Sequence, residues 1–135
     1  MNRTLAAYAA TAVALLVIDM VWLGVIAKPL YQQGIGHLMA PQPRLWAAAL
    51  FYLLYPGGLV LFAVLPNSRA EWPQTALMGA AFGLFAYATY DLTNLATLRD
   101  WPLGLSLIDT LWGAAVSAVA SSAGRAALNH FTPAA

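Results

Sequence analysis

Four long apolar stretches constrain what this chain can fold into, and their interiors hold only three charged residues. Each stretch reaches the length of about 20 residues that an α-helix needs to cross a bilayer. None shows the alternation of apolar and polar residues that is typical of a transmembrane β-strand. We therefore expect an all-α fold, an integral membrane bundle of four transmembrane helices in a single domain over residues 1–135. The expected helices span about residues 4–27, 45–65, 73–98 and 103–126.

The composition excludes several other classes of protein. Hydrophobic residues make up 61% of the chain and charged residues 8%, whereas a soluble domain carries about 25% charged residues. A disordered chain is excluded because it needs low hydrophobicity and high net charge. The net charge of +1 provides no basic surface for nucleic acid, so we expect membrane lipid and no nucleic acid among the partners. The absence of cysteine excludes disulfides and thiol catalysis.

The first stretch and the positive charges bear on how the chain sits in a membrane. Arg3 and the apolar residues after it resemble a signal peptide, but the stretch is longer than a signal core and no small-residue cleavage site follows Asp19. We expect a retained helix. With four spans, the six Lys and Arg residues divide three to three between the two sides, so the positive-inside rule gives no preference. The N-terminal amine then favours both termini in the cytoplasm.

Asp19, Asp91 and Asp109 are the acids inside the apolar stretches. A charged residue at the centre of a spanning helix costs about 2.5–3.5 kcal/mol on insertion scales. Asp19 lies nine residues before Lys28, Asp91 lies eight residues before Arg99, and Asp109 lies eight residues after Trp101. At about 1.5 Å per residue, all three lie roughly 12–13 Å below one membrane face. The four-span topology therefore predicts three carboxylates at one depth, on the side of the first and third loops.

Aromatic and polar residues accompany these acids at helical spacing. Two strings, Ile18-Asp19-Met20-Val21-Trp22 and Ile108-Asp109-Thr110-Leu111-Trp112, share the pattern Ile-Asp-x-aliphatic-Trp. Because their helices run antiparallel, the pattern suits two helices that face each other about a local twofold axis. The residues expected to bind a ligand are Asp19, Asp91, Asp109, Asn94, Tyr87, Tyr90, Trp22 and Trp112.

The residues leave two interpretations of the acids open. The first is a polar cavity within one leaflet, and the second is a set of hydrogen bonds that hold helices together; three acids at one depth favour the cavity. Such a cavity could carry protons, because burial favours the neutral carboxyl group, or bind a cation with help from cation–π attraction. A divalent metal held with His37 is a weaker alternative, since no second histidine lies at ligand spacing, and we expect no metal site.

Three further features lie outside the acidic positions. Tyr55-Pro56-Gly57-Gly58 falls in the middle of the second stretch and predicts either a broken helix that lines a binding site or a plain proline kink. Gly79-Ala80-Ala81-Phe82-Gly83 is a GxxxG pattern, for which we favour packing within the chain over dimerisation. The connection over residues 28–44 is long enough for an interfacial segment above the cavity. A lid is one role for this connection, but we favour an inert amphipathic surface loop.

The segment Tyr90-Asp91-Leu92-Thr93-Asn94-Leu95-Ala96-Thr97-Leu98, followed by Trp101-Pro102, resembles an uncharacterised family of small bacterial membrane proteins. This domain-of-unknown-function family has four predicted helices and a YDLTNLAT-type motif. The resemblance also covers the two Ile-Asp-x-x-Trp segments and extends over almost the whole chain. It implies a four-helix fold and a location in the bacterial inner membrane. It implies no activity.

Three functions follow as hypotheses. The first is a small membrane protein that binds or transports a cationic or polar ligand, or protons, through its acids; transport would require a homodimer. The second is a membrane-embedded enzyme that acts on a lipid or isoprenoid headgroup, with the acids as acid–base groups or magnesium ligands. The third is an accessory subunit of a larger membrane complex. The sequence identifies no cofactor and does not decide whether the protein is an enzyme.

Overall fold

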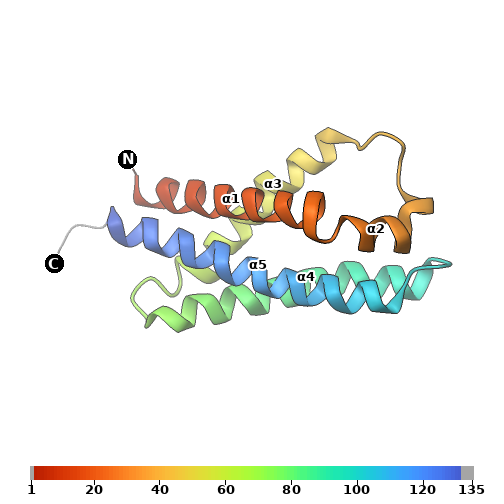
Figure 1. Cartoon of the computed structure of the whole chain (residues 1–135). Coiled ribbons are helices and arrows are strands. Elements are labelled where there is room, and N and C mark those ends of the chain that lie inside the picture. Colours follow the sequence, from red (N-terminus) through yellow and green to blue (C-terminus); the bar gives the residue numbers. More distant parts are fainter. Residues whose placement is uncertain (1, 132–135) are drawn as a thin grey trace.

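The computed structural model of the chain describes residues 2–131, and all regular secondary structure in that range is helical (Figure 1). The all-α fold predicted from the sequence is therefore confirmed. Two of the long helices end in a π-helical turn, η1 and η3. The elements are α1 (Arg3–Val21), η1 (Trp22–Ile26), α2 (Lys28–Ile35), η2 (Gly36–Leu38), α3 (Leu45–Leu59), η3 (Val60–Val64), α4 (Trp72–Thr97) and α5 (Leu103–His130).

The predicted helix boundaries agree closely with the structure, except that α5 continues about one turn past residue 126 to His130. The predicted single domain also includes residues 1 and 132–135, which lie outside the described residues. Three segments are long and apolar enough to cross a membrane: Arg3–Ile26, Leu45–Val64 and Leu103–His130. α4 is 26 residues long but carries threonine, tyrosine, glutamine, asparagine and aspartate, and it is not one of these three. A membrane protein with several candidate spans is thus supported, and a fourth span stays a prediction.

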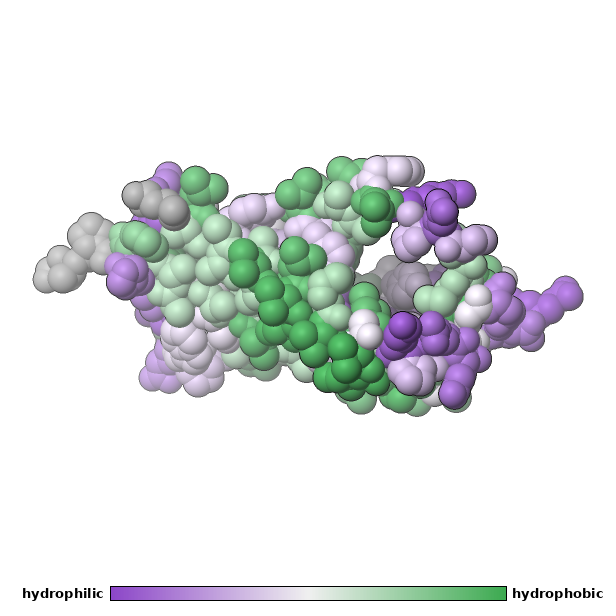
Figure 2. Space-filling model, turned by 45° about the horizontal axis from the view of Figure 1, so that its top comes forward, coloured by the Kyte–Doolittle hydropathy of each residue, from purple (hydrophilic) through white to green (hydrophobic). Residues whose placement is uncertain are grey.

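The surface has the pattern expected of a membrane protein. Many large apolar side chains are exposed, among them Leu45, Leu54 and Phe85 at 70–75%. Figure 2 shows hydrophobic residues over the middle of one face and hydrophilic residues gathered toward both ends. Such an apolar band between polar ends matches the hydrocarbon core of a bilayer between its headgroup layers.

Small residues bring α4 and α5 into close contact, and the two helices lie side by side (Figure 1). A Cβ atom added to Gly83 would lie 2.1 Å from the carbonyl oxygen of Gly113, and one added to Gly79 would lie 2.8 Å from that of Ser117. Only glycine permits this approach of the two backbones. The GxxxG pattern therefore packs within the chain, as the sequence analysis favoured.

α3 continues through Pro56 without a break and ends at Leu59. Proline cannot donate a backbone hydrogen bond, so the carbonyl oxygen of Tyr52, four residues earlier, loses its helical donor. The Tyr8 hydroxyl on α1 donates to the adjacent Leu53 carbonyl oxygen at 2.7 Å and so ties α1 to this part of α3. Of the two predicted alternatives, a helix broken at this point is wrong, because α3 is helical on both sides of Pro56.

The connection over residues 28–44 is more ordered than an inert surface loop, so that interpretation is wrong. Its first part forms α2, and Ile35 packs in a buried cluster with Trp101 and Leu105. Gly34 lies so close to the α4–α5 connection that an added Cβ would stand 3.2 Å from Pro102. α2 is therefore fixed against the N-terminal end of α5, at one end of the bundle.

Arg125 fixes the opposite end of the bundle. It is the only Lys or Arg on α5, and its side chain is only 7% exposed. The guanidinium group donates to the connection between η3 and α4 and to the first turns of α4: its acceptors are the carbonyl oxygens of Asn67, Ala70 and Glu71 and the Thr75 hydroxyl. The planar fork of arginine suits several acceptors at once, so Arg125 holds this connection against α5.

Candidate functional site

A cavity of about 460 Å³ lies between the helices, in the half of the bundle that carries α2. Figure 2 shows the molecule hollowed at this end. Every helix from α1 to α5 contributes a side chain, and seven of the eleven lining residues are aromatic. The lining residues are Asp19, Leu23, Tyr31, Phe51, Tyr52, Tyr55, Ala86, Tyr87, Tyr90, Asp109 and Trp112.

Asp19 on α1 lines the cavity, and its side chain is only 5% exposed. Its two oxygens accept from different helices. The Trp112 indole nitrogen on α5 donates to Oδ1 at 3.0 Å, and the Tyr52 hydroxyl on α3 donates to Oδ2. Both donors are neutral, so each oxygen receives one hydrogen bond but the side chain gains no positively charged partner from them.

Asp109 is the counterpart of Asp19 on α5 and is 6% exposed. The Tyr31 hydroxyl on α2 donates to its Oδ1, and the Trp22 indole nitrogen donates to that hydroxyl at 3.2 Å. The rings of Trp22 and Trp112 stack with their centroids 4.2 Å apart and their planes 5° apart. The tryptophans of the two Ile-Asp-x-x-Trp strings therefore face each other in this stack. The two strings differ at the acids, because Tyr31 stands between Trp22 and Asp109.

Tyr31 is the link between the connecting segment and the acids. Burial raises the pKa of its hydroxyl well above the ordinary value for tyrosine, and the hydrogen bond to Asp109 raises that pKa further. A neutral tyrosine hydroxyl can donate one hydrogen bond while it accepts another. Tyr31 therefore stays a donor to Asp109 and ties α2 to the cavity wall.

Asp91 lies behind the cavity and does not line it. The side chain has no exposed surface. The Thr110 hydroxyl donates to Oδ2 at 3.4 Å, and Oδ1 is buried without a hydrogen-bond donor. The Asp109 side chain interacts with that of Asp91. Asp91 thus stands one layer deeper in the protein than the other two acids.

The structure brings together most of the predicted ligand-binding residues. Asp19, Asp109, Tyr87, Tyr90 and Trp112 line the cavity. The remaining three, Trp22, Asp91 and Asn94, do not line it. Trp22 and Asp91 still contact lining residues, through Tyr31 and Asp109 respectively. Asn94 is partly buried on α4 outside the lining set.

Sequence reasoning missed several lining residues, of which Tyr31 and Tyr52 matter most because each donates to an acid. Tyr52 lies three residues before Tyr55 and one turn before Pro56, in a stretch with no charged residue. A tyrosine in an apolar helix at such a spacing was the available signal. Phe51, Tyr55, Leu23 and Ala86 complete the missed set.

The cavity is electrostatically one-sided, because none of the lining residues is Lys, Arg or His. Among residues 2–131, the ion pair found is His37 with Asp100, 4.0 Å apart and largely exposed. Within that same range, no three His, Cys, Asp or Glu side chains gather closely enough to hold a metal ion. His37 lies in this exposed pair and does not join the acids in such a cluster.

The fold and the cavity define a helical membrane protein with an acidic, aromatic cavity at one end of its bundle. The family model of the predicted membrane proteins DUF2177 matches residues 4–126. The chain belongs to this family, whose function is unknown, and the resemblance drawn from the sequence is confirmed. No curated protein and no solved structure matches the chain.

Proposed function

We propose that this protein binds a small hydrophobic cation in the acidic, aromatic cavity. The observation that carries the proposal is the presence of two buried carboxylates, Asp19 and Asp109, in a cavity whose lining holds no basic residue. As the family resemblance implies, we place the protein in the bacterial inner membrane. The four-span arrangement then has both termini in the cytoplasm.

The size and walls of the cavity fit such a ligand. Its volume of about 460 Å³ lies within the range of about 300–1,000 Å³ for small-molecule sites. Aromatic faces attract cations by about 0.5–2 kcal/mol each, most strongly where water is excluded. Tyr87, Tyr90 and Trp112 supply such faces beside the acids. An ammonium group with apolar substituents would satisfy both the charge and the aromatic walls.

The hydrogen bonds at the acids favour a cation over a neutral polar ligand. Asp19 already accepts from Tyr52 and Trp112, and Asp109 accepts from Tyr31. What both carboxylates lack is a positive charge, and a buried charge without a partner is strongly destabilising. A cation supplies that charge without displacing the donors.

The test uses phenyltrimethylammonium, which cannot gain or lose a proton, and its uncharged isostere tert-butylbenzene. Calorimetric titration of the purified protein should show binding of the cation, with the isostere at least tenfold weaker. Asp19→Asn and Asp109→Asn should each weaken cation binding at least tenfold, because each removes one of the two charges. Equal binding of cation and isostere would contradict the proposal.

Asp100→Asn is the matched control variant. Asp100 is exposed and lies outside the cavity lining, and asparagine tolerates its positive φ of 65°. Cation affinity should match that of the unmodified protein. If Asp100→Asn weakens binding as much as Asp19→Asn does, the cation binds to surface charge and not in the cavity.

Transport of the cation is the stronger form of this proposal. The hollow lies at one end of the bundle (Figure 2), so passage to the other membrane face calls for a homodimer, as expected from the sequence. Uptake of the labelled cation into proteoliposomes, with crosslinking to detect the dimer, tests this form. If the protein binds the cation but the proteoliposomes take up none, whether or not a dimer is crosslinked, the function is restricted to binding.

A further inference from the structure

Asp91 is the buried acid that the proposed cation site does not use. It has no exposed surface and is absent from the cavity lining. Its Oδ1 has no donor, and the Thr110 hydroxyl reaches Oδ2 only at 3.4 Å. A buried carboxylate with so few donors lacks the hydrogen bonds that normally stabilise its charge.

The groups around Asp91 provide no positive charge. On α5, Thr110, which donates to Asp91, directly follows Asp109, and the Asp109 side chain interacts with that of Asp91. Tyr31 on α2 and Tyr90 on α4 also interact with its charge, and both carry neutral hydroxyls. Two ionised carboxylates have no hydrogen to share, so a bond between them requires one proton.

We propose that Asp91 and Asp109 together hold one proton while the cavity is empty, and that a cation bound beside Asp109 releases this proton to solution. This inference rests on the proposed function for its second half. In the empty state the pair carries one proton and a charge of −1. In the occupied state the carboxyl O–H bond is broken, the proton passes to the buffer, and the cation replaces its charge. The net charge of the site is −1 in both states.

The exchange makes cation binding depend on pH. Protons compete with the cation for the same pair of carboxylates, so affinity falls as the pH is lowered, by at most tenfold per pH unit for one proton. Asp91 acts here as a positioning residue, because it holds the proton while Asp109 faces the ligand. Buried acids with linked titrations behave as a pair and not as separate residues.

The first experiment measures proton release with a pH indicator in weakly buffered solution as phenyltrimethylammonium is added. The unmodified protein should release close to one proton per bound cation. Asp91→Asn should still bind the cation but release almost none, since the asparagine amide can donate to Asp109 in place of the shared proton. Asp100→Asn should behave as the unmodified protein. Equal release by Asp91→Asn and the unmodified protein, or no release by either, would overturn the inference.

The second experiment needs no ligand. Infrared spectroscopy of the empty protein should show the C=O stretch of a protonated carboxyl group. The band should persist in Asp19→Asn and Asp100→Asn and disappear in Asp91→Asn and Asp109→Asn. If the band is present but no cation binds, the proposed function fails and the shared proton stands. If the band is absent from the unmodified protein, the shared proton is wrong whatever the cation does.

Discussion

The acids of the cavity depend on the hydroxyl and indole groups that reach them from other helices. Asp19 takes one bond directly from Trp112, whereas Asp109 receives its bond through Tyr31. Trp22 therefore acts one step further from a charge than Trp112 does, although the two indoles form one stack. The same substitution of tryptophan in the two Ile-Asp-x-x-Trp segments should therefore change stability by different amounts.

Trp112→Phe should cost more stability than Trp22→Phe. The first removes a donor to a buried carboxylate, a bond worth about 1.5–3 kcal/mol, and the second removes a donor to a neutral hydroxyl, worth about 1 kcal/mol. Both remove the indole stack, so both should abolish the same exciton signal in circular dichroism. Thermal unfolding in detergent measures the difference. Trp46→Phe, at a position 68% exposed, is the control, and equal losses for the two stacked positions would contradict the prediction.

Tyr31 should make the fold sensitive to alkaline pH. Burial raises the pKa of its hydroxyl in the folded state, so the unfolded chain loses that proton first, from about pH 10. The contribution of Tyr31 to stability is therefore complete below about pH 10 and is lost progressively as the pH rises toward its raised pKa. Melting temperatures between about pH 8 and 11 should fall more steeply for the unmodified protein than for Tyr31→Phe. Parallel curves for the two proteins would show that Tyr31 is not the responsive group.

At the level of elements, glycine spacing decides which helices approach most closely. Gly83 of α4 meets Gly113 of α5 so closely that an added Cβ would stand 2.1 Å from backbone oxygen. Backbone atoms cannot move aside as a flexible side chain can. The helices would have to separate, and the buried face that includes Ser117 would lose its packing.

Gly83→Ala should therefore destabilise the protein by about 1–3 kcal/mol, the usual cost of overpacking a core. Gly104→Ala is the matched control, because nothing lies within 4 Å of a Cβ at that position of α5. Alanine favours a helix over glycine by about 1 kcal/mol, so the control should be neutral or stabilising. Chemical denaturation in detergent measures both. A loss at Gly104 as large as that at Gly83 would contradict the prediction, because the close approach to backbone oxygen exists only at Gly83 of the two.

Some features of these elements could be predicted from the sequence and others could not. Helix boundaries followed from apolar length, and the opposed Trp22 and Trp112 followed from helical spacing. Tyr31 and Tyr52 were missed because their contacts with Asp109 and Asp19 join residues 78 and 33 positions apart. The periodicity of residues within one helix does not indicate which other helix a tyrosine contacts.

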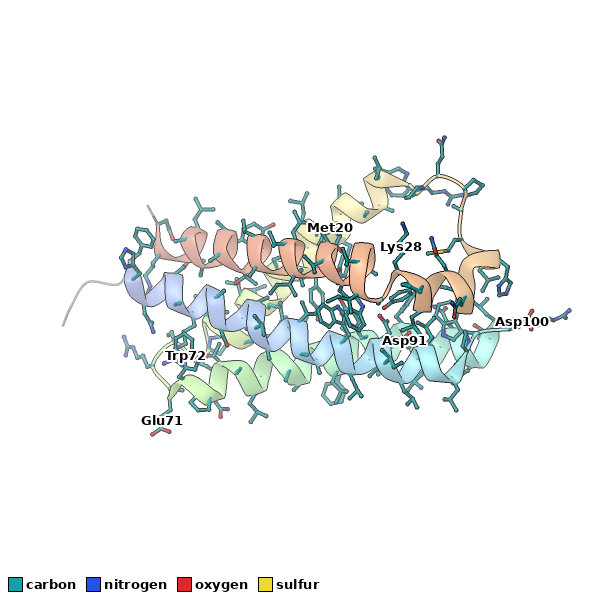
Figure 3. All side chains as sticks on the ribbon, viewed as in Figure 1. Met20, Lys28, Glu71, Trp72, Asp91 and Asp100 are labelled. Carbon is teal, nitrogen blue, oxygen red and sulfur yellow. The ribbon has the colours of Figure 1, made fainter. Side chains whose placement is uncertain are left out.

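At the scale of the whole molecule, the two ends of the bundle differ. α1 begins and α5 ends at one end, to which Arg125 also ties the connection before α4 (Figure 1). The cavity, α2 and the α4–α5 connection lie at the other. Figure 3 shows Glu71 and Asp100 at opposite ends of the molecule, with Asp91 in the half that carries Asp100. If α4 spans the membrane, these two ends lie on opposite sides of it.

Single cysteines can decide this, because the chain has none of its own. Ala40→Cys and Arg99→Cys should react with a membrane-impermeant maleimide from one side of sealed vesicles, and Ser68→Cys only from the other. At about 1.5 Å per residue, the 26 residues of α4 reach about 39 Å, which exceeds the hydrocarbon thickness of about 30 Å. The unmodified protein is the unlabelled control, and permeabilised vesicles should label all three variants. Labelling of Ser68→Cys and Arg99→Cys from the same side would mean that α4 does not cross, and Asp91 would then lie in a helix that only the other spans shield from water.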